Sequence, residues 1–181
     1  MDSRAAAPGA LALVEEFLRT RNQVADAPYL DAWRARHGLT GQVTAETFAR
    51  AIRLREALRS LILANNGGPV DAVAVDLVNA EIGACGLRPH VQFDGSSVRV
   101  QWGVGGVASD RAAGEILAVV LAGVIVALAD GSWRRMKACA AEDCHYAFYD
   151  HTRNRSGRWC DVAGCGANAR MRVYRQRWSR A

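Results

Sequence analysis

Four cysteines near the C-terminus lie in two short pairs, and they constrain the fold more than any other feature of the sequence. The segment CAAEDCHYAFYDHTRNRSGRWCDVAGC has the spacing Cys-x4-Cys-x15-Cys-x4-Cys, with thiols at Cys139, Cys144, Cys160 and Cys165. Each short pair can form a turn that presents two thiolates to one side, and a tetrahedral metal ion can join the two turns. The spacing therefore predicts a small module that folds around one metal ion.

The donor set indicates which metal this module would hold. Four thiolates suit Zn²⁺ best, and iron is the alternative because it also accepts soft sulfur ligands in tetrahedral geometry. A closed four-cysteine site leaves no position for a substrate, so the expected zinc, one ion per chain, is structural. His145 and His151 also lie between the pairs, but two complete cysteine pairs make them spectators.

The start of the sequence and its cysteine usage point to a reducing compartment. Residues 1–17 contain an early acid and no basic start leading into an apolar run, so they do not resemble a signal peptide. We expect a cytoplasmic protein without a membrane partner, in which clustered cysteines bind metal. The apolar segment Ile116–Ala129 has 14 residues, whereas a membrane span needs about 20, and it is expected to form a helix buried on all sides.

Charge is distributed unevenly along the 181 residues. Residues 131–181 contain 11 Lys/Arg and 4 Asp/Glu, a net charge of +7, whereas residues 1–130 have a net charge of −2. A near-neutral body with a basic C-terminal part favours a polyanionic partner, nucleic acid before membrane. A basic tail that only aids solubility is the alternative.

Hydrophobic periodicity predicts a mainly α fold with one small β-hairpin. Alternation in HVQFDGSSVRVQW, with a turn at Asp94-Gly95, places the hairpin near residues 90–102. Helical spacing predicts the other elements, over residues 10–21, 28–38, 44–64, 71–84 and 110–129. The predicted domains are a helical body, residues 1–130, and a zinc module with a basic helix, residues 131–181.

Two of these helices carry specific expectations about burial. Thr44 is expected to cap the third helix. Charged residues on the solvent side of that helix are expected to be Arg50, Arg53, Glu56 and Arg59. Apolar residues facing inward from the fourth helix are expected to be Val73, Leu77 and Val78.

The body contains no combination of residues that predicts catalysis. His37 and His90 have no obvious partner in the sequence, and Cys85 is expected to be a buried packing residue. The glycine-rich stretch Gly103–Gly106 lacks the Lys-Ser/Thr of a phosphate-binding loop. We therefore expect a protein that is not an enzyme.

The sequence after the last cysteine, ANARMRVYRQRWSR, predicts a basic helix. At about 100° per residue, Met171, Tyr174 and Trp178 fall on one side and arginines occupy the rest of the circumference. The apolar stripe is expected to dock on the zinc module or the body, while the arginines face outward. Arginine has planar donors that suit phosphates and guanine edges.

Aromatic residues follow the first cysteine pair, at Tyr146, Phe148 and Tyr149. They are expected to form a small core over the metal site, with Trp159 packing from the other side. Stacking on nucleic-acid bases is the alternative.

Residues 134–177 resemble the CGNR zinc-finger family of bacterial proteins. In that family a Cys-x4-Cys pair and an aromatic stretch precede Asp-x-Ser/Thr-Arg-Asn, Arg-Trp-Cys-x4-Cys-Gly-Asn-Arg and a basic helix. The four cysteines match in place, and so do Asp150, Thr152, Arg153, Asn154, Arg158 and Trp159. The body is similar, in the order and length of its elements, to the ABATE domain. The resemblance implies a stress-responsive transcriptional regulator whose finger binds DNA.

The sequence departs from the family motif at one point. Cys-Gly-Asn-Arg becomes Cys-Gly-Ala-Asn at residues 165–168, so the asparagine and arginine of the motif are absent in register. If those residues cap the helix or contact DNA, this chain does so through Asn168 and Arg170 or not at all.

These observations predict a transcriptional regulator that binds double-stranded DNA, with a body that senses a small-molecule effector or forms a homodimer. The expected DNA contacts come from the loop between the cysteine pairs and from the basic helix: Arg153, Arg155, Arg158, Arg170, Arg172, Arg175 and Arg177. A protein-interaction adaptor with a purely structural zinc module is the first alternative. RNA binding through the aromatic residues is the second.

Overall fold

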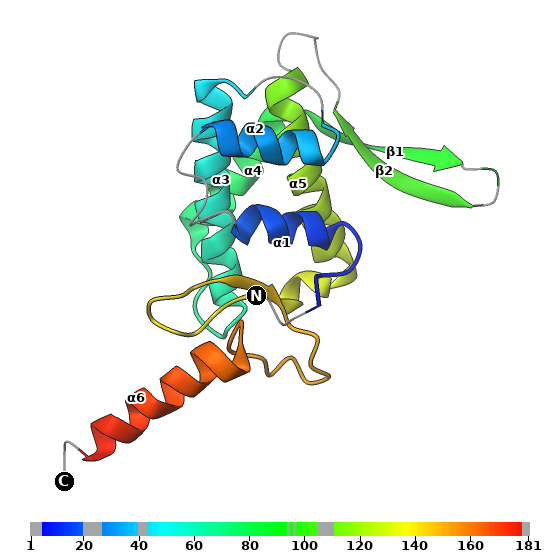
Figure 1. Cartoon of the computed structure of the whole chain (residues 1–181). Helices are drawn as coiled ribbons and strands as arrows, with labels where there is room; N and C mark the ends of the chain where they lie inside the picture. The colour runs from blue at the N-terminus through cyan, green and yellow to red at the C-terminus, as the bar shows by residue number, and fades with distance from the viewer. Residues whose placement is uncertain are drawn as a thin grey trace.

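The computed structural model describes residues 5–19, 27–39, 43–93, 95, 97–104 and 111–178, without the side chains of residues 99, 103, 104, 111–115 and 177. Helices α3 and α5 run side by side through the body, α1 and α2 cross them, and the last helix points away from the molecule (Figure 1). The α-helices are α1 (Leu11–Arg19), α2 (Ala27–Arg36), α3 (Ala45–Ala64), α4 (Ala72–Ala84), α5 (Arg111–Asp130) and α6 (Ala167–Trp178). The predicted mainly α class is confirmed.

Capping residues fix the ends of the two consecutive helices α3 and α4. The hydroxyl of Thr44 accepts a hydrogen bond from the backbone N–H of Thr47 at 3.1 Å, as its place before α3 predicts. Asp71 caps α4 in the same way, by accepting from the N–H groups of Val73 and Ala74. Between them, α3 stops before Asn65, and the chain turns through Gly67, whose φ of 97° favours glycine.

The apolar core lies where α5 packs against α1, α3 and α4. Gly123 lets α1 approach closely, because a Cβ at this position would lie 2.8 Å from a methyl group of Val14. The expectation that α5 is buried on all sides is wrong: Val126 is 42% exposed and Leu128 is 57% exposed. No helix in the described part of the chain is both long enough and apolar enough to cross a membrane.

A hairpin of β1 (Leu87–Phe93) and β2 (Val98–Val104) leaves the helices and extends to one side (Figure 1). The strands are antiparallel, with Val91 opposite Val100, so the hairpin predicted near residues 90–102 is confirmed. In the expected turn, Asp94 lies outside the described residues and Gly95 has a φ of 90°.

A second two-stranded sheet, which the sequence did not predict, lies in the zinc module. Strand β3 (Met136–Ala138) pairs antiparallel with β4 (Ala147–Tyr149), after a 3₁₀ helix at Ser132–Arg135. All six strand residues are buried, and the sheet packs against α1 and α3. The apolar core therefore continues from the helices into the zinc module.

Two further expectations about burial, one for α3 and one for α4, are also wrong. Arg59 is 5% exposed, because residues of the zinc module cover the side of α3 that local periodicity assigned to solvent. Val73 is 75% exposed. The buried positions of α4 are Ala74, Val78 and Glu81, and this spacing turns Val73 away from the core.

Candidate metal centre and nucleic-acid interface

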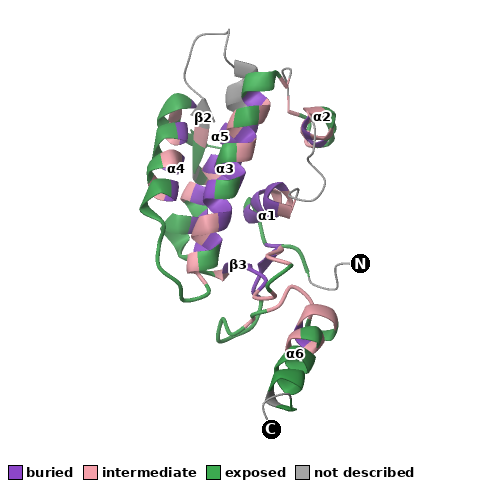
Figure 2. Cartoon of the chain, turned by 90° about the vertical axis from the view of Figure 1, so that its left-hand side faces the viewer, coloured by how far each residue is buried: buried purple, intermediate pink, exposed green. Residues whose placement is uncertain are grey.

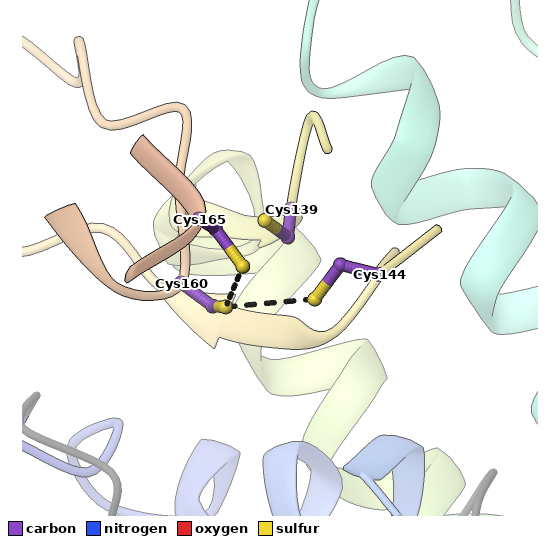
Figure 3. A group of neighbouring side chains, drawn as sticks. All are labelled: Cys139, Cys144, Cys160 and Cys165. Carbon is purple, nitrogen blue, oxygen red and sulfur yellow. Dashed lines mark hydrogen bonds between the residues drawn. The ribbon is translucent and has the colours of Figure 1, made fainter. Parts of the chain in front are cut away.

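Four cysteine thiols meet at the end of the second sheet (Figure 3). Cys139 follows β3, Cys144 closes the next turn, and Cys160 and Cys165 come from the segment before α6. All four sulfur atoms lie within 4.8 Å of one another. The Sγ atoms of Cys144 and Cys160 are 3.6 Å apart, and those of Cys160 and Cys165 are 3.7 Å apart.

These distances fit a tetrahedral zinc ion. Zn–S bonds of about 2.3 Å in a regular tetrahedron place neighbouring sulfurs roughly 3.8 Å apart. All four cysteines are free thiols, so no disulfide competes for them. The cluster could therefore coordinate one zinc ion per chain, and the closed donor set would give that ion a structural role.

The protonation of the thiols couples the site to pH. Burial, together with the neighbouring thiols, raises the pKa of Cys160, and burial raises the pKa of Cys165 to about 11. Zinc favours the thiolate forms, so its binding would release protons. The affinity of the site for zinc would consequently fall as the solution becomes more acidic.

Backbone hydrogen bonds and one close packing contact hold the ligand turns in place. The N–H of Cys139 donates to the carbonyl of Tyr146 at 2.9 Å, which closes the first turn. The second turn is the π-helical segment Val162–Gly166, which leads directly into α6. Trp159 packs closely against this turn: a Cβ at Gly166 would lie only 2.9 Å from its ring.

Asp150 is the acceptor around which the loop between the cysteine pairs folds. It is fully buried and accepts hydrogen bonds from the backbone N–H of Thr152 at 3.0 Å, its hydroxyl at 2.7 Å and the N–H of Gly157 at 2.8 Å. Its carboxylate also forms an ion pair with Lys137 at 3.0 Å. These contacts explain the Asp-x-Thr part of the motif, a pattern typical of a turn in which a carboxylate binds the backbone two residues on. No local pattern of this kind predicts that Lys137 pairs with Asp150.

The aromatic residues after the first cysteine pair face the body. Phe148 and Tyr149 are buried, and Tyr149 belongs to the core shared with the helices. The guanidinium of Arg19 lies over the ring of Tyr146, 5.1 Å from the ring centroid. Burial leaves the rings of Phe148 and Tyr149 without a face for stacking on bases.

Helix α6 leads away from the metal centre, and most of its residues are exposed (Figure 2). Met171, Tyr174 and Trp178 are 50–69% exposed, so the expectation that they dock on the rest of the protein is wrong. The side of α6 turned toward the first cysteine turn is a different one, and it lines a shallow pocket there through Asn168, Ala169, Arg172, Val173 and Gln176.

The structure places most of the expected DNA-contacting arginines at the surface. Exposed members of the set are Arg153, Arg155, Arg158, Arg170, Arg172 and Arg175. The side chain of Arg177 lies outside the described residues. Arg172 is already paired, with Glu142 at 2.6 Å and Asp143 at 3.0 Å. Within the described part of the chain, Arg170 and Arg175 form no ion pair.

Comparison with known protein families shows which family the chain belongs to. Residues 135–178 match the family described as "CGNR zinc finger". Residues 10–131, more than half of the chain, match the ABATE family, described as "Putative stress-induced transcription regulator". The chain belongs to the ABATE family. No curated protein matched it.

Both family descriptions support a regulatory role, and neither describes an enzyme family. The resemblance stated from the sequence is therefore confirmed for the ABATE body and for the finger. The departure at residues 165–168 has a structural counterpart: α6 begins at Ala167, and among the described residues Asn168 forms no side-chain hydrogen bond. Capping by Asn168, one of the two roles expected for it, is thus not observed.

Buried polar side chains connect the ABATE helices to the finger. Glu15 in α1 is 1% exposed and accepts a hydrogen bond from the backbone N–H of Tyr149 at 2.8 Å. Arg59 in α3 donates to the backbone carbonyl of His145. Asn65 and Asn66, just after α3, donate to backbone carbonyls between residues 133 and 138 at 2.8–2.9 Å. Sequence reasoning missed all four, because their partners lie 68 residues or more away in the chain.

Proposed function

We propose that this ABATE protein regulates transcription by binding double-stranded DNA through the finger and α6. One observation carries the proposal: α6 projects from the metal centre, and every residue from Arg170 to Gln176 is exposed. Zinc would contribute by fixing the start of this helix, since Cys165 lies two residues before it. The protein would respond to stress, in keeping with the family description. We also propose that it acts in the bacterial cytoplasm and that its body senses an effector.

The two faces of α6 differ in what they offer to a phosphate backbone. At about 100° per residue, Arg170 and Arg175 border the stripe of Met171, Tyr174 and Trp178 on its two sides. This outer face carries cations without an ion-pair partner among the described residues. Arg172 lies on the other side of the helix, against the acidic pair Glu142 and Asp143. Arg170 and Arg175 are therefore the proposed primary phosphate contacts.

The loop between the cysteine pairs supplies a second group of exposed arginines. Arg153 and Arg155 are exposed, and the guanidinium of Arg158 lies 5.4 Å from the ring centroid of Trp159. A stacked guanidinium is held in position while its N–H donors stay available. We propose that these residues contact phosphates beside the groove occupied by α6, which would set the orientation of the finger on the duplex.

Salt-dependent binding to duplex DNA tests the proposal. The logarithm of the DNA-binding constant falls linearly with the logarithm of salt concentration, and each phosphate contact makes this slope steeper by about 0.9. Arg170→Ala combined with Arg175→Ala should therefore flatten the slope by roughly 1.8. Fluorescence anisotropy with a labelled duplex measures this. The matched control, Arg53→Ala with Arg88→Ala, removes two exposed arginines from the body and should leave the slope unchanged. An unaltered slope in the α6 variant at full zinc content would contradict the proposal.

The exposed apolar stripe of α6 favours one alternative, the protein-interaction adaptor. A stripe such as Met171, Tyr174 and Trp178 can enter the groove of a protein partner. If that role is the main one, Tyr174→Ala should abolish partner capture, and duplex binding should be weak at every salt concentration. Preference for single-stranded RNA over duplex DNA in the same titration would favour the second alternative.

A further inference from the structure

The β1–β2 hairpin has two chemically different faces. Because side chains alternate along a strand, cross-strand partners lie on the same face. One face of the ribbon is apolar along its length, with Pro89 opposite Trp102, Val91 opposite Val100 and Phe93 opposite Val98. The other face carries polar groups, among them Arg88, His90, Gln92 and Gln101.

The apolar face begins at the core and continues into solvent. At the base of the hairpin, Leu87 packs against the helical core and Trp102 is half-buried. Further out, the four apolar side chains are open to solvent: Val91 is 70%, Phe93 68%, Val98 68% and Val100 61% exposed. The outer part of the hairpin stands clear of the helices (Figure 1).

A free two-stranded ribbon of this kind needs a partner to be stable. Isolated two-stranded hairpins are marginally stable in water unless a further layer covers their apolar face. Monomeric proteins also rarely leave contiguous apolar patches larger than a few hundred Å² in contact with water. The exposed face of the hairpin therefore has the character of an interface.

We propose that a second copy of this chain covers the face, so that two hairpins pack face to face across a two-fold axis in a homodimer. The face is uncharged and can therefore pack against itself without bringing like charges together, although each chain has a net charge of +5. Arg88 points to the opposite side of the ribbon and stays in water. Two faces of a few hundred Å² each would together bury roughly 1,000 Å² with their rims, the lower bound for a specific interface.

Pro89 favours this geometry over the addition of strands at the edge of β1. Proline has no backbone N–H, so the edge of β1 lacks a donor where an added strand would need one. The apolar face remains as the surface that can bury side chains of a second ribbon. A two-fold axis near the centre of the face would bring Val91 and Val100 of one copy over the same pair of the other.

Charge substitutions at the proposed centre of the interface provide the test. Sedimentation velocity of the zinc-loaded full chain should give twice the mass of the 19.5 kDa protomer. Val91→Glu and Val91→Lys should each raise the dimer dissociation constant by at least about 100-fold, because like charges would face each other. Mixing the two variants should restore a dimer of opposite charges. The control Gln92→Glu, on the polar face of the same strand, should dimerise like the parent.

Three results would overturn the proposal. The first is a parent protein that stays monomeric at high concentration. If that monomer also sediments with phosphatidylglycerol vesicles, the apolar face binds lipid instead of a second copy. The second is a dimer that both Val91 variants leave intact. The third needs no variant: hydrogen exchange in residues 87–104 of the parent should slow as protein concentration rises through the dissociation constant given by sedimentation, and a constant rate across that range would exclude dimer formation through the hairpin.

Discussion

At the residue scale, the carboxylate of Asp150 makes the stability of the loop between the cysteine pairs, here called the zinc loop, depend on pH. Burial alone would raise the pKa of Asp150, but hydrogen bonds from Thr152, Lys137 and Gly157 outweigh it and lower the pKa to about 2. A carboxyl whose pKa falls on folding stabilises the protein at any pH above its pKa in the unfolded chain, here 3.8. This contribution to stability is lost as the pH falls toward 2, the pKa in the folded protein.

We expect Asp150→Asn to lower the free energy of unfolding by about 2 kcal/mol at neutral pH, because an amide cannot accept all these hydrogen bonds or pair with Lys137. Urea unfolding of the zinc-loaded protein measures the difference. Asp76→Asn, which changes an exposed carboxylate of α4, serves as the control and should stay within about 0.5 kcal/mol of the parent. Equal stabilities for the two variants would mean that the zinc loop does not depend on the Asp150 carboxylate.

Glu142 and Asp143 form ion pairs with Arg172, one of the residues expected to contact DNA. Glu142→Gln with Asp143→Asn should release Arg172, strengthen duplex binding and steepen the salt slope by about 0.9. The same pair of substitutions in an Arg172→Ala background is the control, since only the general change in charge remains there. If the two substitutions steepen the salt slope equally with and without Arg172, the acids act through overall charge and not through Arg172.

At the scale of elements, α6 owes little of its stability to packing by its apolar stripe. Trp178 is 69% exposed, whereas Trp33 in α2 is fully buried. Trp178→Ala should therefore change the free energy of unfolding by less than about 0.5 kcal/mol. Trp33→Ala, the same substitution in the core, should cost about 3–5 kcal/mol. Urea titrations compare the two, and a loss above about 1 kcal/mol for Trp178→Ala would indicate that α6 packs against another surface in solution.

Much of the fold was readable from local sequence. The helices and the hairpin were predictable because periodicity and caps such as Thr44 are local signals. The metal ligands were predictable because the spacing of the paired cysteines is itself a sequence pattern. Strands β3 and β4 were not, since three residues are too few for an alternating pattern. The stripe on α6 shows another limit: helical spacing is the same whether Met171 and its neighbours are docked or exposed. Burial of Arg59 depends on a carbonyl 86 residues away, which no local pattern encodes.

At the scale of the whole molecule, the zinc module and the helices share buried polar contacts. Whether the parts divided near residue 130 unfold separately stays a prediction. The structure leads us to expect coupling, because loss of the zinc module would leave Glu15 without the Tyr149 N–H and Arg59 without the His145 carbonyl.

Removal of zinc should therefore loosen α1 more than α4. We expect Cys160→Ser to unfold residues from about 135 onward and to speed hydrogen exchange in α1, while α4, which contacts α3, α5 and β1, keeps its protection. Mass spectrometry of deuterated peptides resolves the two helices. Cys85→Ser, outside the metal centre, is the control and should exchange like the parent. Unchanged exchange throughout α1 in Cys160→Ser would show that the body is independent of the metal.

The bond between Glu15 and Tyr149 also has a consequence for how the protein is made. The two residues are 134 positions apart, and at 5–20 residues per second a ribosome needs roughly 7–27 s to add the second after the first. Throughout that interval the nascent α1 carries a carboxylate with no Tyr149 N–H to bind. A chain that terminates before the finger keeps this defect, and we expect cellular proteases to remove it. Burial of the Glu15 carboxylate would then be satisfied only once the chain is complete through Tyr149 and the zinc module has folded.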